Sequence, residues 1–431
     1  MNWFGIHFRY FSLFFVVPLL IGFSSAQAGL NTQEDPAALK AEAWETWEKG
    51  EIEEAGKLAK ELVQIKSEAS SGYHLLFLKN FLEGNYREAL QIYKEIDPEY
   101  AEYGELDTTV VNTYVFLKRY AEAEQFARSR NMEEYRIASL KQLREHPLKV
   151  RLDTLTVIPF AKGSMHEYFP DFEVELNGEK LVANVDTGGA FLHMAPERAE
   201  ELGIELIPFG KGLQADTETD LYQGIAESFI LGEAILENVP VVTLDSLKGQ
   251  KYVIFGTSIL SQFFSTLDYP NKRLILSPRD DVEFQEEHLA MLSPDRVEIP
   301  FYLAQSHKMF ARGALGEHEN LNFFIDSGLV YIRSDEKGER RQAAFTATPS
   351  MYEQWGYDAE DVKRKWFKSR HSLALGSLKQ EGHYFTTSEL DFGPYEGVKI
   401  HGLLSHAFLK KYAWTIDFSK RRYIFSSQPK D

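Results

Sequence analysis

The sequence reads ANVDTG at residues 183–188 and FFIDSG at residues 323–328. In each stretch an apolar run leads into an aspartate, a hydroxyl residue and a glycine. A single Asp-Ser-Gly is a common turn, because these residue types suit tight turns. Two of them at matching places in a repeated sequence are much more specific. They make Asp186 and Asp326 candidate functional residues.

The sequence around the two stretches repeats as well. Residues 256–264 recur as 402–409, and each copy leads to an Asp-aromatic pair and a short apolar run. Alternating stretches such as FEVEL at 172–176, followed by Asn-Gly, indicate short strands and hairpins. The sequence therefore predicts a mostly β region made of two copies of one lobe, over residues 148–280 and 281–431.

A different repeat precedes the β region. The segments GEIEEA, GNYREA and KRYAEA end at Ala55, Ala89 and Ala123, which are 34 residues apart. This is the tetratricopeptide period, and small alanines let paired helices approach closely. We expect residues 29–147 to form an all-α array of tetratricopeptide-like helix pairs, which ends where a proline disfavours further helix. Two roles are open for the array: a surface that binds a peptide or protein partner, or a brace packed on the next domain.

The N-terminus has the pattern of a secretory signal peptide. It carries Arg9 and no acid, then an apolar run over residues 10–23, then SSAQA ending at Ala28. Small residues before the expected cut favour cleavage after Ala28. The apolar run is shorter than the roughly 20 residues that span a bilayer. We therefore expect an exported protein, periplasmic or secreted, with residues 1–28 as its signal peptide.

Composition excludes several classes of function. The chain of 431 residues has 65 acidic and 47 basic residues, a formal net charge of −18, so nucleic acid is not expected as a partner. There is no cysteine, which excludes disulfides, thiolate metal sites and a cysteine nucleophile. The twelve histidines include no HExxH-like pair. We predict neither a metal nor another cofactor.

An apolar strand that leads into Asp-Thr/Ser-Gly once per lobe resembles the two-lobed aspartic proteases of the pepsin and retropepsin class, including bacterial retropepsin-like aspartyl proteases. The resemblance covers residues 150–426. It implies an all-β two-lobed acid-protease fold with Asp186 and Asp326 as the catalytic pair. It also implies four residues that support the pair: Thr187, Gly188, Ser327 and Gly328.

Two carboxylates also make chemical sense for peptide hydrolysis. Without a metal or a nucleophilic side chain, one group must take a proton from water and another must give a proton to the carbonyl oxygen. Like charges a few ångströms apart cannot both ionise, so one acid keeps its proton while the other is charged. We therefore predict an aspartic endopeptidase that acts on a peptide or protein substrate. Because one chain supplies both acids, we expect the active site to be complete in a monomer.

The sequence also predicts hairpins that close over the substrate. In lobe one the expected flap spans residues 211–226. Its Tyr222 has the place of a flap tyrosine, but an ordinary strand aromatic is the simpler interpretation, so Tyr222 is not counted among the catalytic residues. In lobe two, residues 375–387 would form a second, shorter flap.

Two departures from the family pattern leave alternatives open. Gly189 and Leu329 follow the two triplets, where the family usually has Ala, Ser or Thr, and His401 precedes a glycine where lobe one has Phe255. One alternative is a catalytically inactive peptide-binding or scaffold protein that retains the protease fold. Another is a regulatory protease that cuts a single partner recruited by the helical array.

Overall fold

The computed structural model describes residues 35–162, 170–214, 217–334, 338–388 and 393–427. The expected signal peptide at residues 1–28 lies outside the described residues. Within the described ranges, no helix has both the length and the apolar character needed to cross a bilayer.

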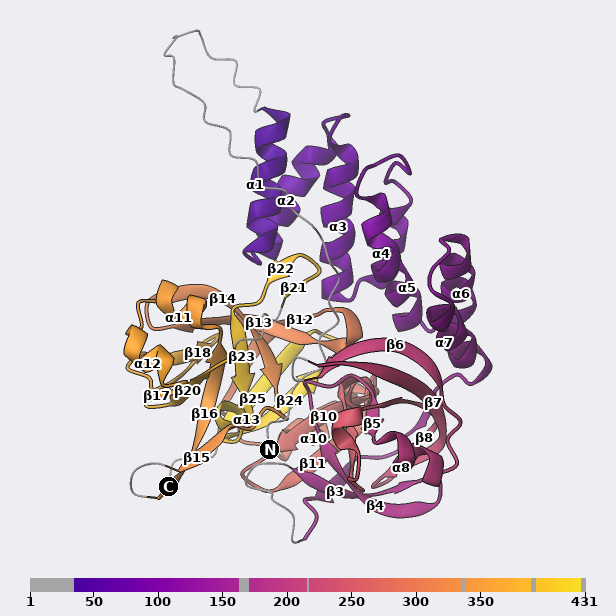
Figure 1. The fold of residues 1–431 in the computed structure, drawn as a ribbon, viewed down its shortest axis with the longest axis vertical. Coiled ribbons are helices and arrows are strands. Elements are labelled where there is room, and N and C mark those ends of the chain that lie inside the picture. Colours follow the sequence, from indigo (N-terminus) through magenta and orange to yellow (C-terminus); the bar gives the residue numbers. More distant parts are fainter. Residues whose placement is uncertain (1–34, 163–169, 215–216, 335–337, 389–392, 428–431) are drawn as a thin grey trace.

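The N-terminal part of the described chain is helical, and the part that follows is mostly β, as predicted (Figure 1). The alanines that define the repeat, Ala55, Ala89 and Ala123, are fully buried and lie near the start of every second helix. Gly84 ends a helix with a left-handed φ of 83°, which glycine adopts without strain. The helices are α1 (Pro36–Glu48), α2 (Ile52–Val63), α3 (Ala69–Glu83), α4 (Tyr86–Tyr93), α5 (Asp107–Phe116), α6 (Tyr120–Ser129) and α7 (Glu134–Glu145).

The first β unit, residues 149–278, contains an eight-stranded sheet. Its strand order is β1 (Lys149–Arg151), β8 (Ala234–Thr243), β5 (Leu192–Met194), β9 (Val253–Phe255), β4 (Glu179–Val185), β3 (Asp171–Leu176), β7 (Thr217–Leu231) and β6 (Ile207–Gln214). The strand β4 runs parallel to β9. Two short helices complete the unit, α8 (Pro196–Glu201) and α9 (Thr257–Leu260).

The second β unit, residues 296–427, belongs to a larger sheet that also takes three strands from the first unit. The order is β17 (Trp366–Lys368), β20 (Tyr384–Thr387), β16 (Arg340–Ala347), β23 (Gly402–Ser405), β14 (His318–Asp326), β13 (Met309–Leu315), β12 (Arg296–Leu303), β25 (Arg422–Ser427), β24 (Tyr412–Asp417), β10 (Phe263–Asp268), β11 (Arg273–Pro278) and β2 (Thr156–Pro159). The two units join where β10 pairs antiparallel with β24, and the hydroxyls of Thr266 and Thr415 lie 2.6 Å apart there.

The remaining strands and helices lie outside these two strand orders. They are β15 (Ile332–Ser334), β18 (Leu373–Leu375), β19 (Leu378–Gln380), β21 (Pro394–Tyr395), β22 (Val398–Lys399), α10 (Val282–Ala290), α11 (Pro349–Gln354), α12 (Ala359–Lys363) and α13 (His406–Leu409). The expected first flap corresponds to the antiparallel hairpin of β6 and β7. In the region of the expected second flap, β18 and β19 form a short hairpin that turns at Gly376, with φ 52°.

The strand register corrects one part of the sequence alignment. In the first unit Val185 pairs with Phe255, and in the second unit Ile325 pairs with Leu404, both in parallel. Gly256 therefore corresponds to Ser405, so the match of residues 256–264 with 402–409 was wrong by three residues. Gly402, which the sequence match paired with Gly256, is needed for packing, because a Cβ there would lie 2.2 Å from Cζ of Phe345.

The same shift changes the meaning of His401. This residue does not occupy the place of Phe255, because it precedes β23. Its Nδ1 accepts a hydrogen bond from the backbone N–H of Asn322, at 3.0 Å. Burial lowers the pKa of His401 to about 4. His401 is therefore a structural residue at a strand end and no departure from the family pattern.

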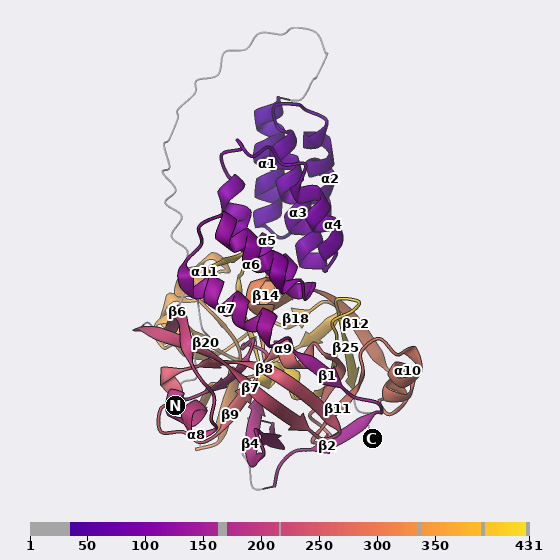
Figure 2. The ribbon, with the colours of Figure 1, turned by 90° about the vertical axis from the view of Figure 1, so that its right-hand side faces the viewer.

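The helices lie directly against the second β unit (Figures 1 and 2). They share one apolar core with it. Trp47 is 1% exposed, and its Nε1 donates a hydrogen bond of 2.7 Å to the backbone oxygen of Glu396. This packing favours the brace among the two roles expected for the helices. From the β unit, the shared core takes Ala304, Phe310, Phe324, Leu329, Tyr395, Val398, Ile400 and Leu403.

Candidate active site

Asp186 and Asp326 lie at equivalent strand ends, each beside a parallel neighbour. Asp186 directly follows β4, and its N–H donates to the oxygen of Phe255 in β9 at 3.1 Å. Asp326 is the last residue of β14, which pairs with β23. In each loop the glycine two residues later donates its N–H to the carboxylate: Gly188 to Asp186 at 2.7 Å and Gly328 to Asp326 at 2.9 Å.

The hydroxyl residues between the aspartates and the glycines link the two loops. The N–H of Thr187 donates to Oγ of Ser327, and the N–H of Ser327 donates to Oγ1 of Thr187, both at 3.0 Å. Thr187 Oγ1 also donates to the backbone oxygen of Ile325 at 3.1 Å. Thr187 and Ser327 are buried. These reciprocal bonds hold the loops of the two units in a fixed relation.

Each glycine makes room for the carboxyl group of the other unit. A Cβ on Gly188 would lie 2.5 Å from Cγ of Asp326, and a Cβ on Gly328 would lie 2.2 Å from Cγ of Asp186. Both distances are far shorter than any real contact of a Cβ, so a larger residue would displace the carboxyl group. The loops therefore interlock, and the structure brings together Asp186, Asp326 and the four residues expected to support them.

The electrostatics of the pair are asymmetric. Burial raises the pKa of Asp186, although hydrogen bonds from Asp326 and the glycine amides oppose the rise. Burial, the charge of Asp186 and a hydrogen bond to Asp186 together raise the pKa of Asp326 well above its usual range. Asp326 is 3% exposed, whereas Asp186 is partly exposed. The arrangement favours a proton on Asp326 and a charge on Asp186.

This asymmetry predicts an effect of pH on stability. Between its unfolded and its raised folded pKa, the folded Asp326 binds a proton that the unfolded chain lacks, so folding becomes less favourable as pH rises through this window. Asp326→Asn removes the cost and should raise Tm at pH 7 by a few degrees, with a smaller gain at pH 4.5. Thermal unfolding at both pH values measures the effect.

A matched substitution provides the control for the stability test. Asp268 is also fully buried, but it forms an ion pair of 2.7 Å with Arg273. Asp268→Asn should therefore lower Tm at pH 7, because it breaks a buried pair. If Asp326→Asn also lowers Tm, the carboxyl group of Asp326 does not cost stability at pH 7, and the explanation is wrong.

Two buried residues behind the loops were not expected from the sequence. The ring of Tyr269 packs edge-on against that of His406, with centroids 5.0 Å apart. Burial raises the pKa of Tyr269, its interaction with Ser327 lowers it, and the charges of Asp186 and Asp326 raise it further. The signal was present in the repeat, since the equivalent residue in the second unit is Phe418, without a hydroxyl.

The second unexpected residue is His193 in β5. Its Nε2 lies 3.4 Å from the N–H of Phe191, which donates to it, and its Nδ1 lies 3.1 Å from the oxygen of Val242. Burial lowers the pKa of His193 to about 4, so the ring is neutral and donates from Nδ1. A Cβ on Gly189 would lie 3.2 Å from this ring, so a side chain directly after the first triplet would fit only tightly.

Near its loop, the second unit has larger residues at two places where the first unit has glycine. Leu329 is 4% exposed and packs into the core shared with the helices. Ser405 stands where the first unit has Gly256, and its Oγ donates to the oxygen of Ala343 at 2.5 Å. Neither residue displaces a carboxyl group from the pair. Among the residues that the structure describes, no group of three or more potential ligands could hold a metal ion.

Comparison with known sequences gives one family. The model of the family described as Aspartyl protease matches residues 172–259, a minor part of the chain that contains Asp186. No curated protein sequence matches the chain.

Several solved structures are distantly similar. A retropepsin-like aspartic protease from Rickettsia conorii has 21% identity and a TM-score of 0.24, and the match covers 30% of this chain and 93% of that chain. Conglutin gamma from lupine seeds has 10% identity and a TM-score of 0.38, with coverage of 64% and 95%. Basic 7S globulin from soybean has 11% identity and a TM-score of 0.35, with coverage of 64% and 97%. The family match over residues 172–259 supports an aspartic protease.

Proposed function

We propose that the protein is an aspartic endopeptidase with Asp186 and Asp326 as its catalytic pair. The observation that carries the proposal is the interlocking of the two loops, in which each glycine leaves the space that the other unit's carboxyl group fills. One carboxyl group comes from each β unit, so a single chain supplies the complete pair.

The asymmetry of the pair assigns the two roles. Asp186 is the more exposed acid and carries the charge, so it takes a proton from a water molecule as the oxygen attacks the peptide carbonyl carbon. Asp326 keeps its proton and donates it to the carbonyl oxygen. The tetrahedral intermediate then breaks its C–N bond, while a proton passes from the pair to the leaving nitrogen. The hydroxyl and amide hydrogen bonds around the loops hold both acids in place for these transfers.

Cleavage of a mixed peptide library by the mature protein from pH 4 to pH 8 tests this function. Internal cuts in the library peptides would support the endopeptidase. An intact library, together with micromolar binding of some of its peptides, would favour the binding protein that retains the protease fold. Leu329 and Ser405 are the observations that keep this second function in view.

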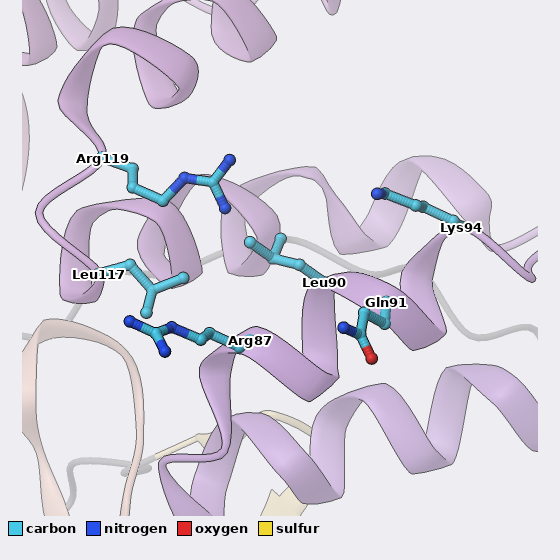
Figure 3. Close-up of a pocket in the computed structure, with 6 residues that line it drawn as sticks. All are labelled: Arg87, Leu90, Gln91, Lys94, Leu117 and Arg119. Carbon is cyan, nitrogen blue, oxygen red and sulfur yellow. The ribbon is translucent and has the colours of Figure 1, made fainter.

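We further propose that the helices are tetratricopeptide-like and that they recruit an acidic segment of a substrate or partner. A hollow of about 360 Å³ opens between α4 and the turn from α5 to α6 (Figure 3). Leu90 and Leu117 provide its apolar surface, and Arg87, Lys94 and Arg119 surround it with positive charge. In a chain of net charge −18 such a basic hollow is complementary to carboxylates that flank an apolar side chain.

The ion pairs leave most of this charge available. Arg119 is paired with Glu122 at 2.8 Å. Arg87 and Lys94 are exposed, and neither has an ion pair within the described ranges of the chain. They are therefore the two cations that an acidic ligand would meet first.

Charge reversal tests the recruiting surface. We expect Arg87→Glu with Lys94→Glu to weaken the binding of a labelled peptide with leucine between aspartates by about 10-fold at low salt, because two attractions become repulsions. Fluorescence anisotropy measures the binding, and added salt should reduce the difference. Lys60→Glu with Lys66→Glu makes the same change of charge on exposed residues outside the hollow. Equal weakening by both pairs of substitutions would contradict a specific site.

A further inference from the structure

Helix α7 holds the β6–β7 hairpin through a buried polar contact. Gln223 in β7 is 2% exposed. Its Oε1 accepts a hydrogen bond from Oγ of Ser139 at 2.7 Å, and its Nε2 donates to Oε1 of Gln142 at 2.9 Å. The side-chain amide of this hairpin residue is thus bonded on both sides by α7. Figures 1 and 2 show α7 beside β6 and β7.

The same helix also contacts the other strand of the hairpin. Gly210 in β6 has a φ of 97° and lies at a shift in the register with β7. A Cβ on Gly210 would lie 2.9 Å from the ring of Tyr135 in α7. The bulged strand therefore lets the tyrosine ring approach the backbone, and α7 fixes both strands.

On its other side, the hairpin packs against the loop that carries Asp186. The rings of Phe209 in β6 and Phe191 pack edge-on, with centroids 6.1 Å apart. Phe191 follows Gly188 by three residues, and its backbone oxygen accepts the N–H of Gly256 at 3.0 Å. The hairpin thus lies between α7 and the loop of the first aspartate.

The helices attach differently to the two β units. On the second unit they share an apolar core that includes Trp47 and Phe324, and opening it would expose a large apolar area. The buried residues of the apolar cluster that contains α7 are all helical, and α7 meets the hairpin through the hydrogen bonds of Gln223 and the ring of Tyr135. Such bonds are replaced by bonds to water when they open, so each of them contributes little net stability. The attachment of the helices to the second β unit is therefore firm, whereas the attachment of α7 to the hairpin can open and close.

We propose that α7 is a polar latch on the β6–β7 hairpin, which holds the hairpin against the loop of Asp186 until the bonds of Gln223 open. Through the latch, the helical part sets how readily the hairpin separates from that loop. That the separation admits a substrate rests on the proposed endopeptidase, whereas the latch itself does not.

Amide hydrogen exchange of the full chain tests the latch. In Ser139→Ala with Gln142→Ala, the amides of residues 207–214 and 217–222, which lie beyond the pairing of β7 with β8, should exchange about 10-fold faster, because two hydrogen bonds are lost and opening becomes easier. The amides of β10 and β24 should keep their rates. Gln125→Ala with Ser129→Ala, exposed residues of α6, should leave the hairpin unchanged.

Two further variants sharpen the outcome. Ser139→Thr keeps the hydroxyl and should keep slow exchange, and Ser139→Ala alone should give a smaller acceleration of about 3- to 5-fold if the double variant does not fold. Unchanged exchange of the hairpin, or equal acceleration throughout the chain, would overturn the latch. The readout needs no substrate, so it separates failure of the latch from failure of the proposed peptidase.

Discussion

Asp186→Asn and Asp326→Asn should each lower kcat/KM for peptide cleavage by at least about 100-fold. Each substitution keeps the shape of the side chain but removes a group that must exchange a proton, and such groups contribute about 100- to 10,000-fold in rate. The two losses should not add in a double variant, because the acids act as one unit. Initial rates on the best-cut library peptide, from pH 4 to pH 8, measure the effect.

A surface substitution separates loss of the pair from loss of charge. Asp295 is exposed, so Asp295→Asn removes one carboxylate without touching the loops and should retain full activity. If an Asn variant of either candidate aspartate cleaves the peptide at the rate of the original chain, that aspartate has no role in proton transfer. Cleavage by both variants would refute the catalytic pair.

Trp47→Ala should lower the free energy of unfolding by about 3–5 kcal/mol, the range for loss of a large buried aromatic side chain. Trp47 is 1% exposed and lies in the core that joins the helices to the second β unit. The substitution should therefore destabilise the β unit together with the helices. Urea unfolding followed at a helical and at a β signal measures both, and the two transitions should shift together.

The conservative substitution at the same place isolates packing from hydrogen bonding. Trp47→Phe keeps most of the ring volume but loses the bond to the oxygen of Glu396, so it should cost much less than Trp47→Ala. A transition of the β signal that stays unchanged in Trp47→Ala would show that the helices fold as a separate unit and brace nothing.

The sequence predicted the parts of the molecule that depend on local pattern. Helices with buried alanines at a fixed period, a β region with Asn-Gly hairpins, and two loops of Asp-Thr/Ser-Gly each reflect residues near one another in the chain. The meeting of Asp186 with Asp326 was also predictable, because a duplicated unit places equivalent strand ends near one symmetry axis. Each Asp-Thr/Ser-Gly loop thus indicates the function of the other, because both stand at the same place in the duplicated unit.

The register of the second copy was not predictable from the same pattern. Gly402 was aligned with Gly256 because both are glycines near the start of a similar stretch. The residue at 402 is a glycine because the ring of Phe345 leaves no space for a side chain there. The true equivalent, Ser405, resembles Gly256 only in backbone position. A glycine in a sequence does not reveal which contact excludes its side chain.

The contacts between the helices and the β units were likewise out of reach. Ser139, Gln142 and Gln223 are ordinary polar residues in the sequence, and 81 or 84 residues separate their bonded pairs. Nothing local distinguishes such residues from solvated ones, since the partner that buries them comes from another element. Sequence alone therefore left the brace and the binding surface as equal alternatives.

The reciprocal fit of Gly188 and Gly328 has a consequence for the newly made chain. Neither half contains a finished centre, since the cavity for each carboxyl group is provided by the half that does not carry it. A chain that folds from its N-terminus has no acid pair until residue 328 has found its place. Any reaction that needs the pair can therefore begin only after the two halves have docked. Until then the newly made chain is inactive without the help of an inhibitory segment.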